Sequence, residues 1–495
     1  MFLRKLFLLI ACFGWTYLDV SAQNFDPPLR LEFDMEENKY PMNMELLGKN
    51  GLVLLFQKAA KEETKWTICH YDTNFQLLKT RAVPFEGKTT VCATASDENF
   101  FYAILQEEKN TKANLINTYI LLYSAETKKI DVFSFYHAEK EKIMSIAYYG
   151  NIFVYHTYNS KSEENVYVFH RQSLTVADLY PEKTGSHEFQ DMYRDSISQR
   201  LWLVSKFYEA KKQASVRLTQ LDAEGNVLQE FVIESDGKYV INSCKIISSQ
   251  DDKLLLVGNY LHNEGSKSST RNNNNGIFTA TVKDGHAEQM RFFDYTNLDN
   301  WYVINKRSLS NCYDILYFVA QNDSFLIMAS DFYAPEYQHY SDPYAVGGGL
   351  YPSTVNSKLI GFRYQTACMF TFDSEGNLLW YNPLNYSGLL LKSVRPLLSG
   401  YIDPETNNVL YLFGFNNKLF SLIYHQMEIV QSIKTITIQS SSRFETIDSG
   451  EKARYQHWYG SYFIGSAYQR TSKKYGSNSR RNSKYVFGVN KLVYE

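Results

Sequence analysis

A tyrosine-rich segment, residues 333–358, carries side chains suited to molecular recognition. Tyrosine offers a large ring and a hydroxyl at modest conformational cost, which suits contact with a protein or a glycan. Long connections between strands often carry function. The binding candidates in this segment are Tyr333, Tyr337, His339, Tyr340, Tyr344 and Tyr351. The sequence therefore predicts a binding loop, and the alternative is a loop that folds back over its own sheet and buries its tyrosines.

An arginine follows directly after this segment. Arg363 lies in an apolar strand pattern and shares one face with Gly361 and Gln365, because side chains alternate along a strand. It either pairs with an acid on a neighbouring strand or points into a central channel, where it would be a further binding residue.

A basic stretch near the end of the chain is the third candidate. No acidic residue lies between Thr471 and Lys484, and the positive charges include Lys473, Lys474, Arg480 and Arg481. Such a cluster suits lipid phosphates or an acidic partner. The alternative is a solvated hairpin with no ligand.

Catalytic signatures are scarce. The sequence contains no nucleophile elbow, zinc-protease motif, phosphate-binding glycine loop or calcium loop, and its histidines are scattered singly. We therefore expect no metal, no cofactor and no enzyme activity. Carboxylates from different sheets could still converge, so a glycan-acting hydrolase or lyase with acids at the ring centre is the alternative.

The elements that must position these residues recur along the chain. Eight apolar runs begin at Gly51, Asn99, Asn151, Arg200, Lys253, Ser324, Asn408 and Gly460. A period near fifty residues with strand-type units predicts an all-β fold, a β-propeller of eight four-stranded blades. Seven blades plus a small end module is the alternative.

Each repeat also carries a second strand pattern that ends in a hairpin turn. Clear turns begin at Asp72, Asp222 and Asp373, with Gly or Asn supplying the tight bend. The expected blades span residues 41–85, 90–137, 142–180, 188–234, 241–295, 312–390, 393–440 and 445–495. The last blade lacks one strand, which alternating residues 29–34 can supply from the N-terminus. This pairing would close the ring.

The N-terminus reads as an export signal. Arg4 and Lys5 precede an apolar stretch and a small-residue cleavage site that ends at Ala22, so residues 1–22 are predicted to be a signal peptide. Lipidation at Cys12 is the alternative. Residues 23–495 are expected to form a single propeller domain. We expect a periplasmic, outer-membrane-associated or secreted protein.

Charge and hydropathy restrict the partners. Cleavage would leave 49 basic and 52 acidic residues, a net charge of −3, which argues against nucleic-acid binding. No later stretch has the roughly 20 apolar residues of a membrane helix, so the processed chain is expected to lack one. A protein partner or a cell-envelope glycan remains, with no prediction of oligomeric state.

Five cysteines would remain after cleavage. They are Cys69, Cys92, Cys244, Cys312 and Cys368. Several lie in apolar strand patterns, which favours buried free thiols. A bridge between Cys69 and Cys92 is the alternative.

The signal, the tyrosine-rich segment, the stretch GFRYQTACMFTFDSEGNLLWYN from Gly361 and the repeat together resemble a known group. The chain is similar to uncharacterised secreted β-propeller proteins of Gram-negative bacteria with type 9 secretion. This resemblance implies an accessory component of the cell envelope, for secretion or surface assembly, that acts as a binding or scaffold protein. It implies no catalytic residues.

Overall fold

The fold was analysed in a computed structural model of the chain. It describes residues 22–24, 29–35, 42–57, 65–85, 87–108, 114–159, 161, 163–181, 186–195, 200–210, 213–234, 237–250, 253–263, 274–298, 312–340, 356–415, 418–436, 438, 445–473 and 484–494. The chain divides into two units, one of residues 35–398 and one of residues 1–34 with 399–495.

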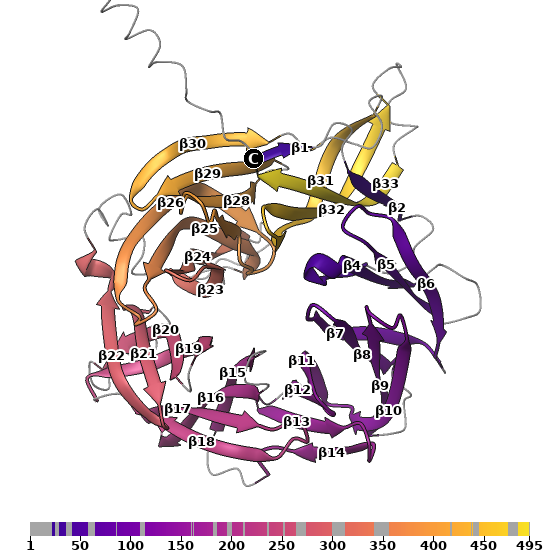
Figure 1. Ribbon diagram of the computed structural model, residues 1–495, viewed down its shortest axis with the longest axis horizontal. Helices are drawn as coiled ribbons and strands as arrows, with labels where there is room; N and C mark the ends of the chain where they lie inside the picture. Colours follow the sequence, from indigo (N-terminus) through magenta and orange to yellow (C-terminus); the bar gives the residue numbers. More distant parts are fainter. Residues whose placement is uncertain are drawn as a thin grey trace, which may run out of the picture. The chain divides into compact units, whose positions relative to one another are not determined.

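The larger unit contains six four-stranded antiparallel sheets, the blades of a β-propeller fold (Figure 1). Blade 1 comprises β3 (Asn43–Leu46), β4 (Leu52–Gln57), β5 (Lys65–Tyr71) and β6 (Leu77–Pro84). Blade 2 comprises β7 (Thr89–Ser96), β8 (Phe100–Glu107), β9 (Leu115–Ser124) and β10 (Ile130–Ala138). Blade 3 comprises β11 (Glu141–Tyr149), β12 (Ile152–Asn159), β13 (Glu164–His170) and β14 (Thr175–Asp178).

The remaining sheets of this unit follow the same order. Blade 4 comprises β15 (Ser186–Asp195), β16 (Arg200–Ala210), β17 (Gln213–Leu221) and β18 (Val227–Ile233). Blade 5 comprises β19 (Tyr239–Gln250), β20 (Lys253–His262), β21 (Gly276–Lys283) and β22 (His286–Asp294). Blade 6 comprises β23 (Tyr313–Gln321), β24 (Leu326–Tyr340), β25 (Asn356–Phe372) and β26 (Leu378–Leu391). The described part of this unit also contains two short 3-10 helices, Gly48–Asn50 and Tyr295–Asn297.

The smaller unit contains the last two sheets. Blade 7 comprises β27 (Leu398–Ile402), β28 (Val409–Phe415), β29 (Lys418–His425) and β30 (Glu428–Ile436). Blade 8 comprises β31 (Glu445–Tyr459), β32 (Tyr462–Lys473) and β33 (Lys484–Tyr494), joined by β1 (Ala22–Asn24) and β2 (Arg30–Asp34). The prediction of eight blades is confirmed, and the seven-blade alternative is wrong.

The N-terminal strand completes the last blade, as predicted. β2 pairs antiparallel with β33, with Arg30 opposite Asn490, and β1 continues along the same strand. The Arg30 guanidinium donates to Asn490 Oδ1 at 2.8 Å and to Gln469 Oε1 at 2.6 Å. Residues from both ends of the chain therefore share one sheet.

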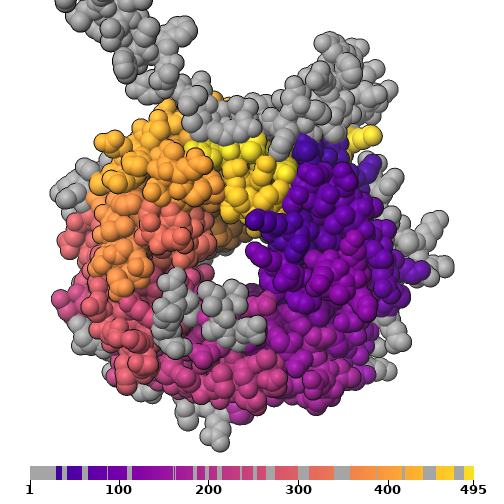
Figure 2. Space-filling view, viewed as in Figure 1, coloured from indigo at the N-terminus to yellow at the C-terminus, as the bar shows by residue number. Residues whose placement is uncertain are grey.

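Successive blades bury their faces against each other. In the cluster between blades 1 and 2, Val53 and Trp66 pack with Phe101 and Leu121. The next residue, Leu122, points to the other face and packs against blade 3. A strand buried on both faces reads as a continuous apolar run, which explains the signal that marks each repeat. In the space-filling view the blades from indigo to magenta form one continuous surface (Figure 2).

The predicted hairpin turns are present. In the turn after β17, the backbone N–H groups of Glu224 and Asn226 donate to Asp222 Oδ1 at 2.9 and 2.8 Å. The turns at Asp72 and Asp373 repeat this arrangement. The aspartate thus replaces missing backbone partners at the bend.

The first strands of blades 2 to 6 share a β-bulge. The register shifts between Val91 and Ala93, between Ile143 and Ser145, and between Phe189 and Asp191. Register shifts also occur in β19 and β23, at other points along the strand. A bulge places two residues opposite one and re-aims the side chains beside it. These first strands lie on the inner side of the curved row of blades in the larger unit (Figure 1).

Candidate ligand-binding cavity

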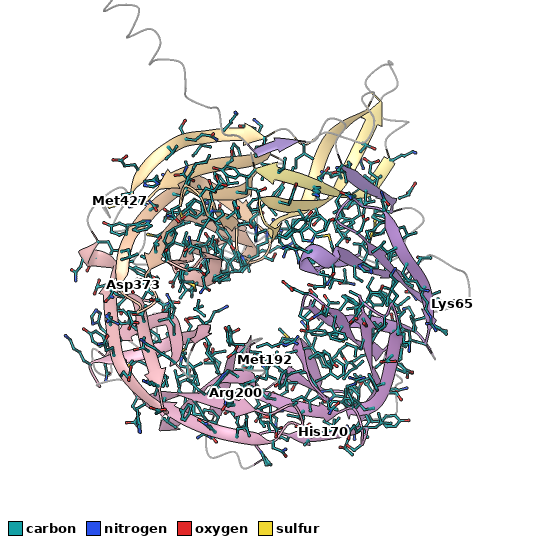
Figure 3. The ribbon with its side chains drawn as sticks, in the orientation of Figure 1. Lys65, His170, Met192, Arg200, Asp373 and Met427 are labelled. Atoms are coloured by element: carbon teal, nitrogen blue, oxygen red, sulfur yellow. The ribbon has the colours of Figure 1, made fainter. Side chains whose placement is uncertain are left out.

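A cavity of about 590 Å³ lies where blades 2, 3 and 4 meet at their first strands. Pockets of this size suit small organic ligands. Its walls come from β7, β8, β11, β12, β15, β16 and the turn after β7. Figure 3 labels Met192, a lining residue in β15, on the inner side of the row.

Two bulges bring polar side chains to this cavity. In β11 the extra residue is Met144, and Ser145 follows it opposite His156. In β15 the extra residue is Gln190, and Asp191 follows it opposite Val204. Ser145 and Asp191 therefore occupy the same place in consecutive blades, and both line the cavity.

The carboxyl group of Asp191 is poorly compensated. Burial raises its pKa to about 6, while the charge of Lys245 and the N–H of Met192 oppose this shift. Within the described part of the chain, no ion pair reaches the Asp191 carboxylate. Desolvation outweighs both effects and disfavours the charged form. The side chain lies on the face of β15 that it shares with Tyr193, near Cys244 and Lys245 of blade 5.

The hydroxyl of Ser145 is also unsatisfied. Its Oγ is buried and has no hydrogen-bond partner among the described residues. Leaving a buried polar group unpaired costs about 1–3 kcal/mol. Because this atom has almost no accessible surface, it lies behind the cavity wall and does not face the open space.

The other charged groups at the cavity are already paired. The guanidinium of Arg194 binds the Asp97 carboxylate. The second oxygen of Asp97 accepts the N–H groups of Asn99 and Phe100 at 2.8 and 2.9 Å. His156 Nε2 lies 3.1 Å from Glu164 Oε2. Among the described lining residues, Asp191 is thus the charged group without an ion pair.

Aromatic and apolar side chains form the rest of the wall. Tyr102 and Tyr148 are buried, and their ring centroids lie 6.1 Å apart. Phe189 stacks on the His156 ring at 4.6 Å. Met144 lies at the mouth, with 49% of its surface exposed. An apolar body with one polar group fits this arrangement.

The predicted binding loop begins as a strand. β24 continues to Tyr340 and β25 starts at Asn356, so the expectation of a loop is wrong at both ends of 333–358. Tyr333 is half-buried and stacks on Tyr313, with ring centroids 5.9 Å apart. It packs as the alternative predicted, whereas Tyr337 is 48% exposed.

The structure places the backbone of two of the other candidates in this segment and does not describe the remaining two. His339 and Tyr340 lie in β24. Tyr344 and Tyr351 lie outside the described residues. Their proposed binding role remains a prediction.

Arg363 pairs with an acid on the neighbouring strand, one of its two predicted arrangements. Its Nη2 donates to Glu336 Oε1 at 2.5 Å, its Nε donates to the other oxygen, and its Nη1 donates to the Gly388 carbonyl at 3.0 Å. This contact lowers the pKa of Glu336. Arg363 is thereby committed within blade 6.

Of the four candidates in the basic stretch, only Lys473 lies in the described part of the chain. Lys473 is the last residue of β32. Lys474, Arg480 and Arg481 lie outside the described residues. The suggestion that they contact phosphate remains a prediction.

The five cysteines are free thiols, and the alternative bridge between Cys69 and Cys92 is not formed. Burial raises the pKa of Cys92 to about 11. No group of three metal-binding side chains occurs in the described ranges. In those same ranges, no helix has the length and apolar character needed to span a bilayer.

The cavity residues carry no motif, so the sequence analysis missed them. The structure supplies an alignment that the sequence alone does not. Aligning the repeats on their bulged first strands places Ala93, Ser145 and Asp191 at one position. A carboxylate at a position that is small in the neighbouring blades marks Asp191 as unusual.

Sequence comparison yields no relative: no family model and no curated protein matches the chain. Solved structures similar in fold include the β-propeller domain of the Trilobed protease from Pyrococcus furiosus, at 9% identity and a TM-score of 0.36, covering 79% of this chain and 99% of that one. The WD40 domain of SCAP from fission yeast matches at 10% identity and a TM-score of 0.36, covering 78% and 82%. Dipeptidyl peptidase 4 from Porphyromonas gingivalis matches at 10% identity and a TM-score of 0.41, covering 92% of this chain and 60% of that one. At this level of identity and TM-score, none of them contributes to the functional argument.

Proposed function

We propose that the protein is an exported, non-catalytic binding protein of the cell envelope that takes a small ligand between blades 2, 3 and 4. One observation carries this proposal: a cavity of about 590 Å³ lies between the first strands of three blades, with Tyr102, Tyr148 and Phe189 among its lining residues. A cavity of this size with aromatic walls suits a small organic ligand.

The export signal supports the cellular location. Residues 1–22 have the charge and apolar pattern of a signal peptide. We propose that the processed chain acts in the periplasm, at the outer membrane or outside the cell. An accessory role in secretion or surface assembly would use the exposed Tyr337 region as a separate protein contact.

A glycan-acting enzyme is the second candidate, because Asp191 and Asp97 line the same cavity. A raised pKa on one carboxyl and an ionised partner is the pattern of such catalysts. However, both oxygens of Asp97 are engaged, one by Arg194 and one by backbone N–H groups. Asp97 is therefore held in place by Arg194 and by its own turn, which favours a structural role for it and binding over turnover.

Crystals soaked with small phenyl compounds test the binding site. We expect 2-phenylethylamine, 2-phenylethanol or 3-phenylpropionate to appear in the cavity beside Tyr102 and Phe189. The variant Ser145→Phe should fill the space and exclude the compound, whereas Met427→Phe, at an exposed turn of blade 7, should not. Compounds bound elsewhere, or equal occupancy in Ser145→Phe, would contradict the proposal.

A panel of envelope glycans assayed for cleavage separates the two candidates. The binding protein releases no product from any of them. Turnover that disappears in Asp191→Asn would show that the cavity is an active site and that the binding proposal is wrong.

A further inference from the structure

The outer strand of blade 2, β10, has an open edge. It is the last strand in the order β7-β8-β9-β10, and among the described residues it pairs with β9 alone. It lies on the outer side of the row of blades in the larger unit (Figure 1). An open edge presents backbone N–H and C=O groups to which another strand can pair, so natural proteins usually protect such edges.

The outer strands of the other blades carry this protection. β14 has four residues, and the outermost strands of blade 8, β1 and β2, have three and five. β6 ends in Pro84 and carries Lys79 and Arg81. Register shifts interrupt the pairing of β18, β22, β26 and β30 with their neighbours. Short strands, prolines, positive charges and bulges all discourage pairing at an edge.

β10 has none of these features. It has nine residues without proline, lysine or arginine, and it pairs with β9 without a register shift. Tyr136 is 72% exposed and Val132 is 42% exposed. Both lie on one face of the strand, and Leu115, opposite Ala138 on that same face, is 55% exposed. The open edge is therefore long, regular and bordered by apolar side chains.

Alternate backbone groups of β10 point away from β9. The N–H of Glu139 donates to the Asn114 carbonyl at 2.9 Å, and the N–H of Ser124 donates to the Lys129 carbonyl at 3.0 Å. Bonded and free positions alternate along one side of an antiparallel strand, so the odd-numbered residues of β10 face β9. The backbone groups turned to the open edge are those of Ile130, Val132, Ser134, Tyr136 and Ala138.

We propose that this edge is a dimerisation surface, on which β10 of a second copy of the chain pairs antiparallel about a two-fold axis at Ser134. In this register the two strands overlap along their full length, and each edge-facing residue meets another. Tyr136 lies opposite the second copy's Val132, and aromatic side chains opposite β-branched ones stabilise antiparallel pairs. Just beyond the strand, Lys129 lies opposite the second copy's Glu139, with opposite charge. The edge is thus complementary to itself, as a two-fold interface requires.

The dimer should dissociate on dilution. One strand pair is a smaller interface than the roughly 800 Å² per partner of a standard complex, so we expect a Kd of about 10–100 µM. In sedimentation velocity of the whole protein, the sedimentation coefficient should rise from that of a monomer toward that of a dimer between about 1 and 200 µM. Over the same range, hydrogen exchange should slow in residues 130–138, because their edge-facing N–H groups become bonded.

Paired substitutions at Ser134 test the register, because this exposed residue lies opposite itself across the two-fold axis. Ser134→Lys opposes two ammonium groups and Ser134→Asp opposes two carboxylates, so each should weaken association about fivefold or more. An equimolar mixture of the two variants should associate again, because opposite charges then face each other. Gln229→Lys, at an exposed position of β18, is the matched control and should associate as the parent does. Equal thermal midpoints confirm that each variant retains the fold.

Three results would overturn the proposal. The first is a parent protein that remains monomeric at about 200 µM. The second is association that Ser134→Lys leaves unchanged, because the dimer would then use another surface. The third is a mixture of the two charged variants that fails to associate, which would leave the edge for a strand of a different protein. None of these results bears on the cavity between blades 2, 3 and 4, which is tested by its occupancy in crystals.

Discussion

Arg194 in blade 4 binds Asp97 in blade 2, so one ion pair spans the first strand of the blade between them. Asp97 lies in the turn after β7, where its other oxygen holds the backbone. Arg194 comes from β15, three residues after Asp191. The pair therefore holds one edge of the cavity, and the charges of Arg194 and Asp97 neutralise each other there.

Removing this ion pair should change stability little. The Arg194 side chain is 36% exposed, and pairs in contact with water contribute less than about 1 kcal/mol. We expect Arg194→Gln to lower the free energy of unfolding in urea by no more than that. A loss well above 1 kcal/mol would show that the pair is shielded from water and holds the two blades more firmly than an exposed ion pair can.

Stability should fall as the pH rises through the range in which Asp331 ionises. Asp331 is buried in β24 and accepts hydrogen bonds from Tyr317, Tyr386 and the N–H of Leu397, at 2.8, 2.8 and 3.0 Å. Burial nevertheless raises its pKa to about 7. The folded state thus holds the proton more tightly than the unfolded chain, whose aspartate has a pKa of about 3.9.

The sign of the pH dependence follows from this shift. The contribution of the Asp331 proton is fully present below about pH 4 and is lost as the pH approaches 7, at a total on the order of 4 kcal/mol. Urea unfolding between these values should show the decline. Asp331→Asn is expected to be less stable at the acidic end and to flatten the curve. An unchanged slope in this variant would show that other groups cause the dependence.

The two described tyrosines of the segment 333–358 should behave differently. Tyr333 is half-buried between Tyr313 and Tyr364, so Tyr333→Ala should cost about 2 kcal/mol of unfolding free energy. Tyr337 is 48% exposed, and Tyr337→Ala should cost less than about 0.5 kcal/mol. Thermal and urea unfolding of both variants test this. A large loss in Tyr337→Ala would remove it as a candidate protein contact.

The blade count and boundaries could be predicted from sequence because burial and turn chemistry are local. β4 is buried at every residue, which yields an unbroken apolar run. The turn at Asp222 depends on the Asp222 carboxylate and on the left-handed backbone of Gly225. Both residues can be recognised in the sequence of the turn. The strand extension was missed because Pro335 lies within β24 and proline usually argues against a strand.

The cavity could not be predicted in the same way. Asp191, Ser145 and Asp97 come from three repeats, and only the packing of blades brings them together. The bulges before Asp191 and Ser145 break the simple alternation of faces without leaving a sequence mark. Residue type alone gave no reason to choose Asp191 over the other acids of the chain.

A glycine pair tests the contact between blades 5 and 6. Gly376 and Gly237 both have left-handed backbones, with φ of +77° and +79°. A Cβ on Gly376 would lie 3.0 Å from Thr279 of the preceding blade, whereas a Cβ on Gly237 would meet no atom within 4 Å. Thr279 Oγ1 also donates to the Gly376 carbonyl at 2.7 Å. The two sites therefore share backbone strain and differ in the neighbouring blade.

Gly237→Ala should cost about 1 kcal/mol of unfolding free energy, the price of a left-handed backbone for an L-residue. Gly376→Ala carries the same strain and must also displace Thr279, so it should cost roughly 2–3 kcal/mol. Urea unfolding of the two variants measures the difference, which isolates the contact between the blades. Equal losses would show that the Asp373 turn and Thr279 do not press against each other in solution.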